Sequence, residues 1–175
     1  MSLSTTIAVK VSATRSDTLD IGTQKALHEL ETALGWASGT AVSQADEIFS
    51  DNRGISAAAF ENFDLTSLSQ LDSSGSTIRT VSFASVKLVW IKNLSTAGYI
   101  KVGGGTNNGS AANAWALAGG MFATDASIIS IPFGGGTLWY EPTGVAVSNG
   151  TADTLSIGAI SETQKVSIII IGEST

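Results

Sequence analysis

The stretch Phe83–Val102, FASVKLVWIKNLSTAGYIKV, constrains the fold of this chain more than any other segment. Its first half is rich in Val, Leu, Trp and Ile, a polar turn is expected at Asn93–Gly98, and Tyr99–Val102 can return as a second strand. Strict alternation places Ala84, Val86, Leu88 and Trp90 on one face, and Lys87, Val89 and Ile91 on the other. Both faces are apolar in the middle. Such a strand is typically interior to a sheet, covered by the core on one side and by a second layer or a neighbouring subunit on the other.

Further strand candidates occur at short spacing along the chain, bounded by Gly, Asn and Ser. They are Ile7–Ala13, Asp46–Phe49, Ile55–Leu65, Ile78–Ser82, Ser127–Pro132, Thr137–Glu141, Gly144–Val147, Thr154–Ile157 and Lys165–Ile171. Ser50–Gly54 is typical of a turn, and Asn149-Gly150 is a strong signal for a tight turn between strands. This many short strands predict an all-β fold, an antiparallel β-sandwich that is jelly-roll-like rather than a closed barrel.

We expect two parts in the chain: an N-terminal arm or extension at residues 1–39 and a β-sandwich domain at residues 40–175. Within the arm, Thr23–Leu34 can form either a short helix or a strand, because three of its leucines also have helical spacing. The strand Ile7–Ala13 can dock on a neighbour by adding to an exposed sheet edge, with its alternating apolar residues Ile7, Val9 and Val11 in pockets. Alternatively, the same strand completes a sheet of its own domain.

Charge and cysteine content exclude several classes of partner. Nine basic and fifteen acidic residues give a net charge of −6, and only 14% of residues are charged, against about 25% in typical globular proteins. A surface with few charges and no basic cluster suits protein–protein packing and predicts no nucleic-acid partner. The absence of cysteine removes disulfides and thiolate metal sites and fits a reducing cytoplasm. The longest aliphatic run, Ile168–Ile171, is too short to span a membrane, so no membrane partner is expected.

Catalytic and ligand-binding motifs are not found in the sequence. The sole histidine, His28, belongs to no metal or nucleophile motif. The glycine-rich run at Gly103–Ser110 lacks the pattern of a phosphate-binding loop, and the acidic residues from Asp46 to Asp64 lack the spacing of a calcium loop. We therefore expect no catalytic residue, no cofactor and no metal, and a protein that is not an enzyme. Four tryptophans can line a sugar-binding surface or belong to the core.

Two apolar segments are candidates for protein contacts. Trp115, Leu117, Met121 and Phe122 cluster around a Gly-Gly pair and form either a satellite of the core or an exposed contact patch. The C-terminal KVSIIII has isoleucines on both faces, so it needs cover from a paired strand or from a second subunit. Together with the two-faced strand at Val86–Ile91, this predicts a homo-oligomer, a dimer or a trimer.

The order of several segments carries a family resemblance. The segments are SGTAVSQAD at Ser38–Asp46, IFSDNR at Ile48–Arg53, FDL at Phe63–Leu65, VSFASVK at Val81–Lys87, IKN at Ile91–Asn93, VGG at Val102–Gly104, GVAVSNGTADTLSI at Gly144–Ile157 and the terminal IIIIG. In this order they resemble small β-rich structural proteins of tailed bacteriophages. The resemblance spans about three-quarters of the chain and leaves residues 1–37 outside it.

The resemblance implies a virion component that is made in the cytoplasm of the bacterial host. As a capsid decoration or cement protein, it would bind the major capsid protein on the capsid surface and stabilise the assembled head. No catalytic or ligand residues come with the resemblance. An alternative from a different class is a carbohydrate- or receptor-binding domain of a phage tail fibre or tailspike, which has a similar composition.

Overall fold

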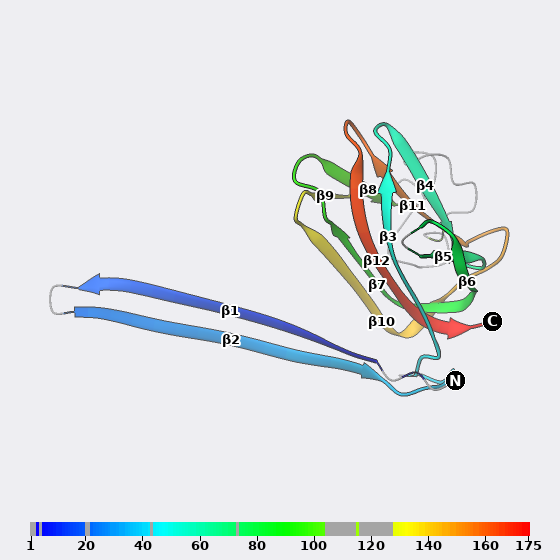
Figure 1. Ribbon diagram of the computed structural model, residues 1–175. Coiled ribbons are helices and arrows are strands. Elements are labelled where there is room, and N and C mark those ends of the chain that lie inside the picture. Colours follow the sequence, from blue (N-terminus) through cyan, green and yellow to red (C-terminus); the bar gives the residue numbers. More distant parts are fainter. Residues whose placement is uncertain are drawn as a thin grey trace.

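The described residues of the computed structural model, 3, 5–19, 22–42, 44–72, 74–103, 115 and 128–175, form twelve strands (Figure 1). These are β1 (Thr5–Leu19), β2 (Gly22–Trp36), β3 (Glu47–Ile55), β4 (Ala59–Asp64), β5 (Leu68–Leu71), β6 (Thr77–Val81), β7 (Phe83–Asn93), β8 (Tyr99–Gly103), β9 (Ile128–Pro132), β10 (Gly136–Ala146), β11 (Thr154–Ala159) and β12 (Gln164–Ser174). Within these ranges there is no helix with the length and hydropathy needed to cross a bilayer.

Eight of the strands form a jelly roll. One sheet has the order β10-β7-β12-β3 and the other the order β4-β11-β8-β9, and all pairs are antiparallel. Along the chain, the first of the eight strands pairs with the last, the second with the seventh, the third with the sixth and the fourth with the fifth. This is the pairing of one long hairpin wound across two sheets, which defines the jelly roll. The predicted all-β, antiparallel, jelly-roll-like sandwich is confirmed, with β5 and β6 as a separate hairpin.

The core lies between the two sheets and is built from the inward rows of both. Its fully buried members include Phe49, Phe83, Val89, Ile91, Ile100, Leu155, Ile157, Val166, Ile168 and Ile170. Strand β12 lies between β7 and β3, so both backbone edges of the C-terminal segment are paired within the same chain. Of the two alternatives for covering this segment, the intramolecular one is confirmed.

A β-bulge in β7 changes the faces predicted from strict alternation. Leu88 pairs with Ile171 and Val86 pairs with Gly172, so Lys87 has no opposite residue on β12. Val86 therefore lies in the core with Val89, while Leu88 belongs to a cluster on the outer face of the sheet. The predictions that Val86 shares a face with Leu88 and that Lys87 shares a face with Val89 are wrong. The extra residue of a bulge re-aims its side chain, here that of Lys87.

Several other local predictions differ from the structure, among them Ile55–Leu65, which is divided between the end of β3 and β4. Ser50–Gly54, predicted as a turn, is the middle of β3 and pairs throughout with β12. Thr137–Glu141 and Gly144–Val147, predicted as separate strands, are joined in β10, with a register shift between Tyr140 and Val145. The turn predicted at Asn149-Gly150 is present, and Gly150 supplies its left-handed conformation, with φ of 76°.

The N-terminal strands form a long two-stranded ribbon, the arm, which Figure 1 shows projecting away from the sandwich. Strand β1 pairs with β2 in unbroken register from Thr5 opposite Trp36 to Leu19 opposite Gly22, and neither strand pairs with a sheet of the sandwich. Thr23–Leu34 is therefore extended, and the helical alternative is wrong. Strand pairing satisfies its backbone groups, and its two-residue alternation of Leu30, Thr32 and Leu34 matches that of Ile7, Val9 and Val11 on β1.

Candidate interaction site

The arm is attached to the outer face of the β10-β7-β12-β3 sheet. Trp36, the last residue of β2, packs with Ala45, Leu88 and Ile171, and these four buried residues are the root cluster. The ring of Trp36 also lies against Tyr140 of β10, with 5.3 Å between ring centroids and an interplanar angle of 57°. The base of the arm thus covers part of the outer face of β7 and β12. From the sequence, a second layer or a neighbouring subunit was expected to cover this face.

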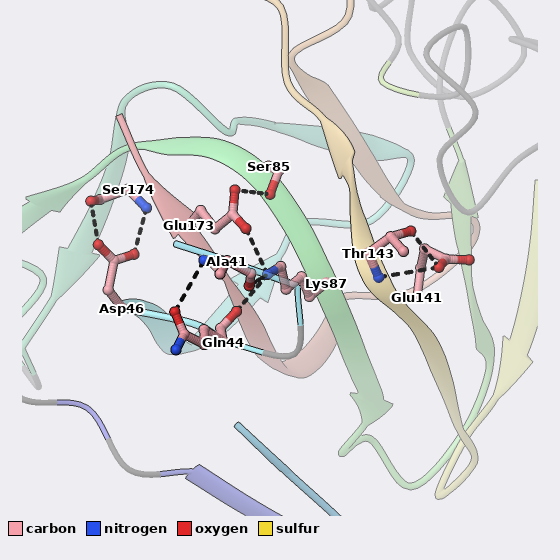
Figure 2. A network of polar contacts seen from close by, with 9 residues as sticks. All are labelled: Ala41, Gln44, Asp46, Ser85, Lys87, Glu141, Thr143, Glu173 and Ser174. Atoms are coloured by element: carbon pink, nitrogen blue, oxygen red, sulfur yellow. Dashed lines mark hydrogen bonds and ion pairs between the residues drawn. The ribbon is translucent and has the colours of Figure 1, made fainter. Parts of the chain in front are cut away.

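A buried lysine holds the connector, residues 37–46, against this sheet. The Nζ atom of Lys87 lies 2.6 Å from Oε1 of Glu173 and donates to the backbone carbonyls of Ala41 at 2.9 Å and Gln44 at 2.5 Å. Lys87 is fully buried, and its three ammonium donors match these three acceptors. Figure 2 shows the side chain of Lys87 directed at the connector. We call Lys87, Glu173 and the two carbonyls the arm clamp.

Neighbouring contacts tie the other end of the connector to the end of β12. The Asp46 carboxylate accepts hydrogen bonds from the backbone N–H and the hydroxyl of Ser174, both at 2.7 Å (Figure 2). The backbone N–H of Asp46 donates to the carbonyl of Gly172. In addition, Glu173 accepts a hydrogen bond from Ser85. The connector therefore leaves the sandwich from a fixed position.

Beyond the root cluster, the outer face of this sheet carries one further apolar row. Trp90 of β7 pairs with Leu138 of β10 on one side and with Ile169 of β12 on the other. Trp90 and Ile169 are half-buried, and Leu138 is 39% exposed. We call these three residues the apolar row. Two residues farther along β7 on the same sheet face, the cross-strand row is polar, as expected for a face in contact with water. In this row Lys92 lies beside Ser167 and Gly136.

The register of the arm pairs mostly apolar residues over the half nearest the sandwich. Ile7, Val9 and Val11 of β1 are opposite Leu34, Thr32 and Leu30 of β2. The exposed residues of this half include Thr6, Ala8, Lys10, Glu31 and Ala33. Farther from the sandwich the register pairs are more polar, for example Arg15 with Ala26 and Asp17 with Gln24. The three arm residues singled out from the sequence thus all lie in β1.

The second contact candidate lies only in part within the described residues. Trp115 is fully buried and packs edge-to-face on Trp139, with 5.2 Å between ring centroids and an interplanar angle of 86°. Trp115 is therefore a core residue, as in the first of the two alternatives given for this cluster. Leu117, Met121 and Phe122 lie outside the described residues.

One acidic residue of β3 and one of β4 are held in a structural network around Arg53. Its guanidinium pairs with Asp51 at 2.8 Å and with Glu61, donates to the carbonyl of Ser69, and lies over the ring of Phe63. Burial raises the pKa of Glu61, while the charge and hydrogen bond of Arg53 partly offset this effect. A cleft of about 160 Å³ borders the network. No group of three His, Cys, Asp or Glu residues that could bind a metal is found among the described residues.

The arm clamp was not predicted from the sequence, although one signal pointed to it. A lysine in the middle of an apolar strand, between Val86 and Leu88, needs a buried partner. The sequence alone does not reveal that partner, because Glu173 lies in the last strand and Ala41 and Gln44 contribute backbone carbonyls.

The described residues define an eight-stranded jelly-roll sandwich that carries a β-ribbon arm. No protein-family model matches the chain, and no curated protein matches it. Among solved structures, similarity is found to a chain from the work "Bacillus endospore appendages form a novel family of disulfide-linked pili", with 16% identity and a TM-score of 0.33. The match covers 79% of this chain and 97% of that chain. A TM-score this low supports no conclusion about function.

Proposed function

We propose that this protein is a non-enzymatic structural component of a tailed-phage virion, a decoration or cement protein. It binds the major capsid protein at the surface of the assembled head and stabilises the shell. The segment resemblance described above supports this proposal, and the jelly roll is an architecture that viral capsid proteins use. Fold alone does not define function, so the proposal depends mainly on the arm.

The arm is the observation that carries the proposal. Each of its strands has 15 residues, compared with at most 11 in the sandwich strands, and 15 residues of strand span about 50 Å. An isolated two-stranded hairpin is marginally stable in water, and proteins rarely leave long strand edges bare. β1 and β2 each keep one edge without a strand partner in the described structure. A shell protein that adds a strand to one of these edges would supply the missing backbone partners.

The polar clusters of the described structure fit this assignment. The arm clamp and the Arg53 network both use their charged groups to join segments of the chain. The proposal therefore assigns no catalytic residue, cofactor or metal, and places all binding in surfaces that contact protein.

A second candidate is favoured by one observation. Trp90 is half-buried and lies in the same sheet face as the partly exposed Tyr140 and Leu138. Sugar-binding surfaces use aromatic rings in this way, and lectins also use jelly rolls. A carbohydrate- or receptor-binding domain of a tail fibre or tailspike would bind through this face, independently of the arm.

A shortened arm tests the proposal. Ala8 and Ala33 are register partners, so replacing residues 9–32 by Asn-Gly joins them through a tight turn. This variant keeps Trp36, the root cluster and the arm clamp, whereas deletion of residues 1–39 would remove Trp36 and uncover Leu88 and Ile171. We expect an unchanged melting temperature of the sandwich and loss of binding to undecorated phage heads, measured by cosedimentation and by occupancy in cryo-electron microscopy.

The outcomes separate the two candidates. Full binding of the shortened variant to heads would contradict the capsid proposal. Glycan or cell binding that survives arm shortening but is lost in Trp90→Ala would instead establish the carbohydrate-binding candidate. The control for the arm is Ala8→Glu in the full-length chain, which changes the exposed ribbon face without shortening the arm.

A further inference from the structure

We infer that this protein forms a two-fold dimer in which β10 of one chain pairs edge to edge, antiparallel, with β10 of a second copy. The pairing segment is Gly136–Tyr140. The two β10-β7-β12-β3 sheets then join into one continuous sheet across both sandwiches. The inference goes beyond capsid binding and concerns the isolated protein, so its failure is distinguishable from failure of the proposed function.

Strand β10 has one unpaired edge over the pairing segment. It is the terminal strand of its sheet and is hydrogen-bonded on one side only, to β7 (Figure 1). The backbone N–H of Asn93 donates to the carbonyl of Gly135. Alternation therefore turns the backbone groups of Gly136, Leu138 and Tyr140 away from β7. No other described segment pairs with this edge, so its N–H and C=O groups are available to a further strand.

The opposite edge of the same sheet, at β3, is blocked by charged side chains. The backbone N–H of Ile48 donates to the Glu47 carboxylate at 2.9 Å, and the Ile48 carbonyl accepts a hydrogen bond from Arg79 of β6. The backbone N–H of Asn52 donates to the Asp51 carboxylate at 2.8 Å. Such charges at an edge strand prevent the addition of another strand. The pairing segment of β10 has no charged side chain, so this sheet is closed at one edge and open at the other.

The pairing segment is complementary to a second copy of itself. A two-fold axis at Leu138 places this residue opposite Leu138 of the second copy, and places Tyr140 opposite Gly136. The phenol ring then covers an edge glycine, which is a favourable cross-strand arrangement. On the core side of the sheet, Trp139 comes opposite Thr137, an aromatic and β-branched pair. No two like charges meet, and each outward backbone group of the segment obtains a partner.

Pairing with a second copy also continues the apolar row. In one chain the row ends at the sheet edge with Leu138, which is 39% exposed. In the joined sheet the row runs from Ile169 and Trp90 through Leu138 into the same three residues of the second copy, and directly opposite apolar side chains bury one another. A second copy therefore fits both the backbone and the side chains of this edge. Because each root cluster lies on this sheet face, both arms leave from one side of the dimer.

A single introduced cysteine tests the position of the two-fold axis. The chain has no cysteine of its own, so Leu138→Cys can form a disulfide only between two chains. Opposite residues of a hydrogen-bonded antiparallel pair have Cα atoms about 5.5 Å apart, within the range of about 4.4–6.8 Å that a disulfide spans. On mild oxidation, Leu138→Cys should form a covalent dimer roughly tenfold faster than Thr143→Cys or more. Thr143 is exposed on the same strand but lies outside the pairing segment.

Charge substitutions at the axis test the pairing independently. Leu138→Lys and Leu138→Glu each place like charges opposite one another, so each variant alone should be monomeric. An equimolar mixture of the two should dimerise again, because lysine then faces glutamate. Asn52→Glu adds a charge to the same sheet away from β10 and should leave the dimer intact. The measurement is light scattering coupled to size exclusion, in which the wild type should show twice the mass of the 17.9 kDa chain.

The shortened-arm variant described above separates this contact from any association through the arm. It keeps β10 and should dimerise as the wild type does, and thermal melting should be alike in all variants because the substituted side chains are exposed. A wild type that is monomeric at about 100 μM would overturn the inference. Equal cross-linking rates of the two cysteine variants would also overturn it, as would a charge mixture that stays monomeric. Loss of the dimer on arm shortening would assign association to the arm instead.

Discussion

Lys87 and Glu173 form an ion pair of 2.6 Å in which the lysine is fully buried, and the same ammonium group binds the connector of the arm. The pair joins the middle of the chain to its last strand, while the carbonyls of Ala41 and Gln44 bring in the N-terminal connector. One side chain therefore fixes where the arm leaves the sandwich. The bulge in β7 makes this possible, because without it Lys87 would face the core.

Substitution Lys87→Met should lower the free energy of unfolding by about 3 kcal/mol, because it removes one partner of a buried ion pair and leaves two carbonyls without their donor. Urea denaturation measures this effect. Hydrogen exchange of the Ala45 and Asp46 amides, which are bonded to Ala37 and Gly172, should also accelerate. Lys92→Met, at an exposed lysine of the same strand, is the control and should change neither measurement. Equal effects of the two substitutions would refute the role of the clamp.

Substitution Gly172→Ala should destabilise the sandwich strongly. An added Cβ atom would lie 2.0 Å from the backbone oxygen of Ser85 and 2.9 Å from the ring of Phe83, so the bulge between β7 and β12 would have to open. We expect a loss of several kcal/mol, in the range of overpacked core sites. Gly54→Ala, in β3 beside β12, meets no atom within 4 Å and should stay within about 0.5 kcal/mol of wild type. Similar denaturation midpoints for the two variants would contradict the close approach of β12 to β7 at Gly172.

Substitution Glu61→Gln should remove a pH-dependent destabilisation. Burial raises the pKa of Glu61 above 4.5 in the folded protein, so the folded state binds its proton more tightly than the unfolded state does. Stability from this group is therefore lost as the pH rises through the window between 4.5 and the raised pKa. From pH 4 to pH 7, the wild type should lose stability relative to Glu61→Gln, measured as urea midpoints.

A variant whose effect on stability changes with pH in the opposite direction is the control for this experiment. Hydrogen bonds from Ser74 and Ser76 lower the pKa of Asp72 below 3.8 in the folded protein. The contribution of the Asp72 carboxylate to folding stability is present above pH 3.8 and is lost as the pH falls through the lowered pKa. The wild type should therefore gain stability relative to Asp72→Asn as the pH rises from 2.5 to 5. The same sign for both variants would show that net charge, rather than these two sites, governs the response.

Substitution Trp115→Ala should affect stability and leave binding to phage heads unchanged. The Trp115 ring is fully buried against Trp139, and truncation of such a residue costs about 3–5 kcal/mol. Because Trp115 is in the core, the fraction of the variant that remains folded should cosediment with undecorated heads as the wild type does. Loss of head binding at unchanged stability would place Trp115 in the contact surface.

Much of the fold was predictable from the sequence because strand alternation and turn residues act locally. Lys165–Ile171 and Thr154–Ile157 were recognised by their β-branched residues, and Asn149-Gly150 by its turn chemistry. The failures occur where tertiary contacts override local preference. Ser50–Gly54 has turn-forming residues, but Asp51 accepts hydrogen bonds from Arg53 of the same strand and from the backbone N–H of Leu71 in β5.

The interaction site was predictable only in its N-terminal part. The alternation of Ile7, Val9 and Val11 is a local pattern, so the strand that contains them followed from the sequence. Leucines at helical spacing also satisfied a strand pattern in Thr23–Leu34, and only pairing with β1 decides between the two. The apolar row required the register of three strands, and the position of Lys87 required a bulge, neither of which is encoded locally.

The jelly-roll pairing also determines when this protein can fold during its synthesis. β3 emerges from the ribosome before the other strands of the sandwich, its partner β12 emerges after them, and the bonded residues Asp46 and Ser174 are 128 positions apart. Contacts this distant in sequence make folding slow. Until β12 arrives, β3 and β7 flank an empty position in their sheet, with bare strand edges that favour aggregation. A nascent chain that stalls before Gln164 therefore cannot close the sandwich.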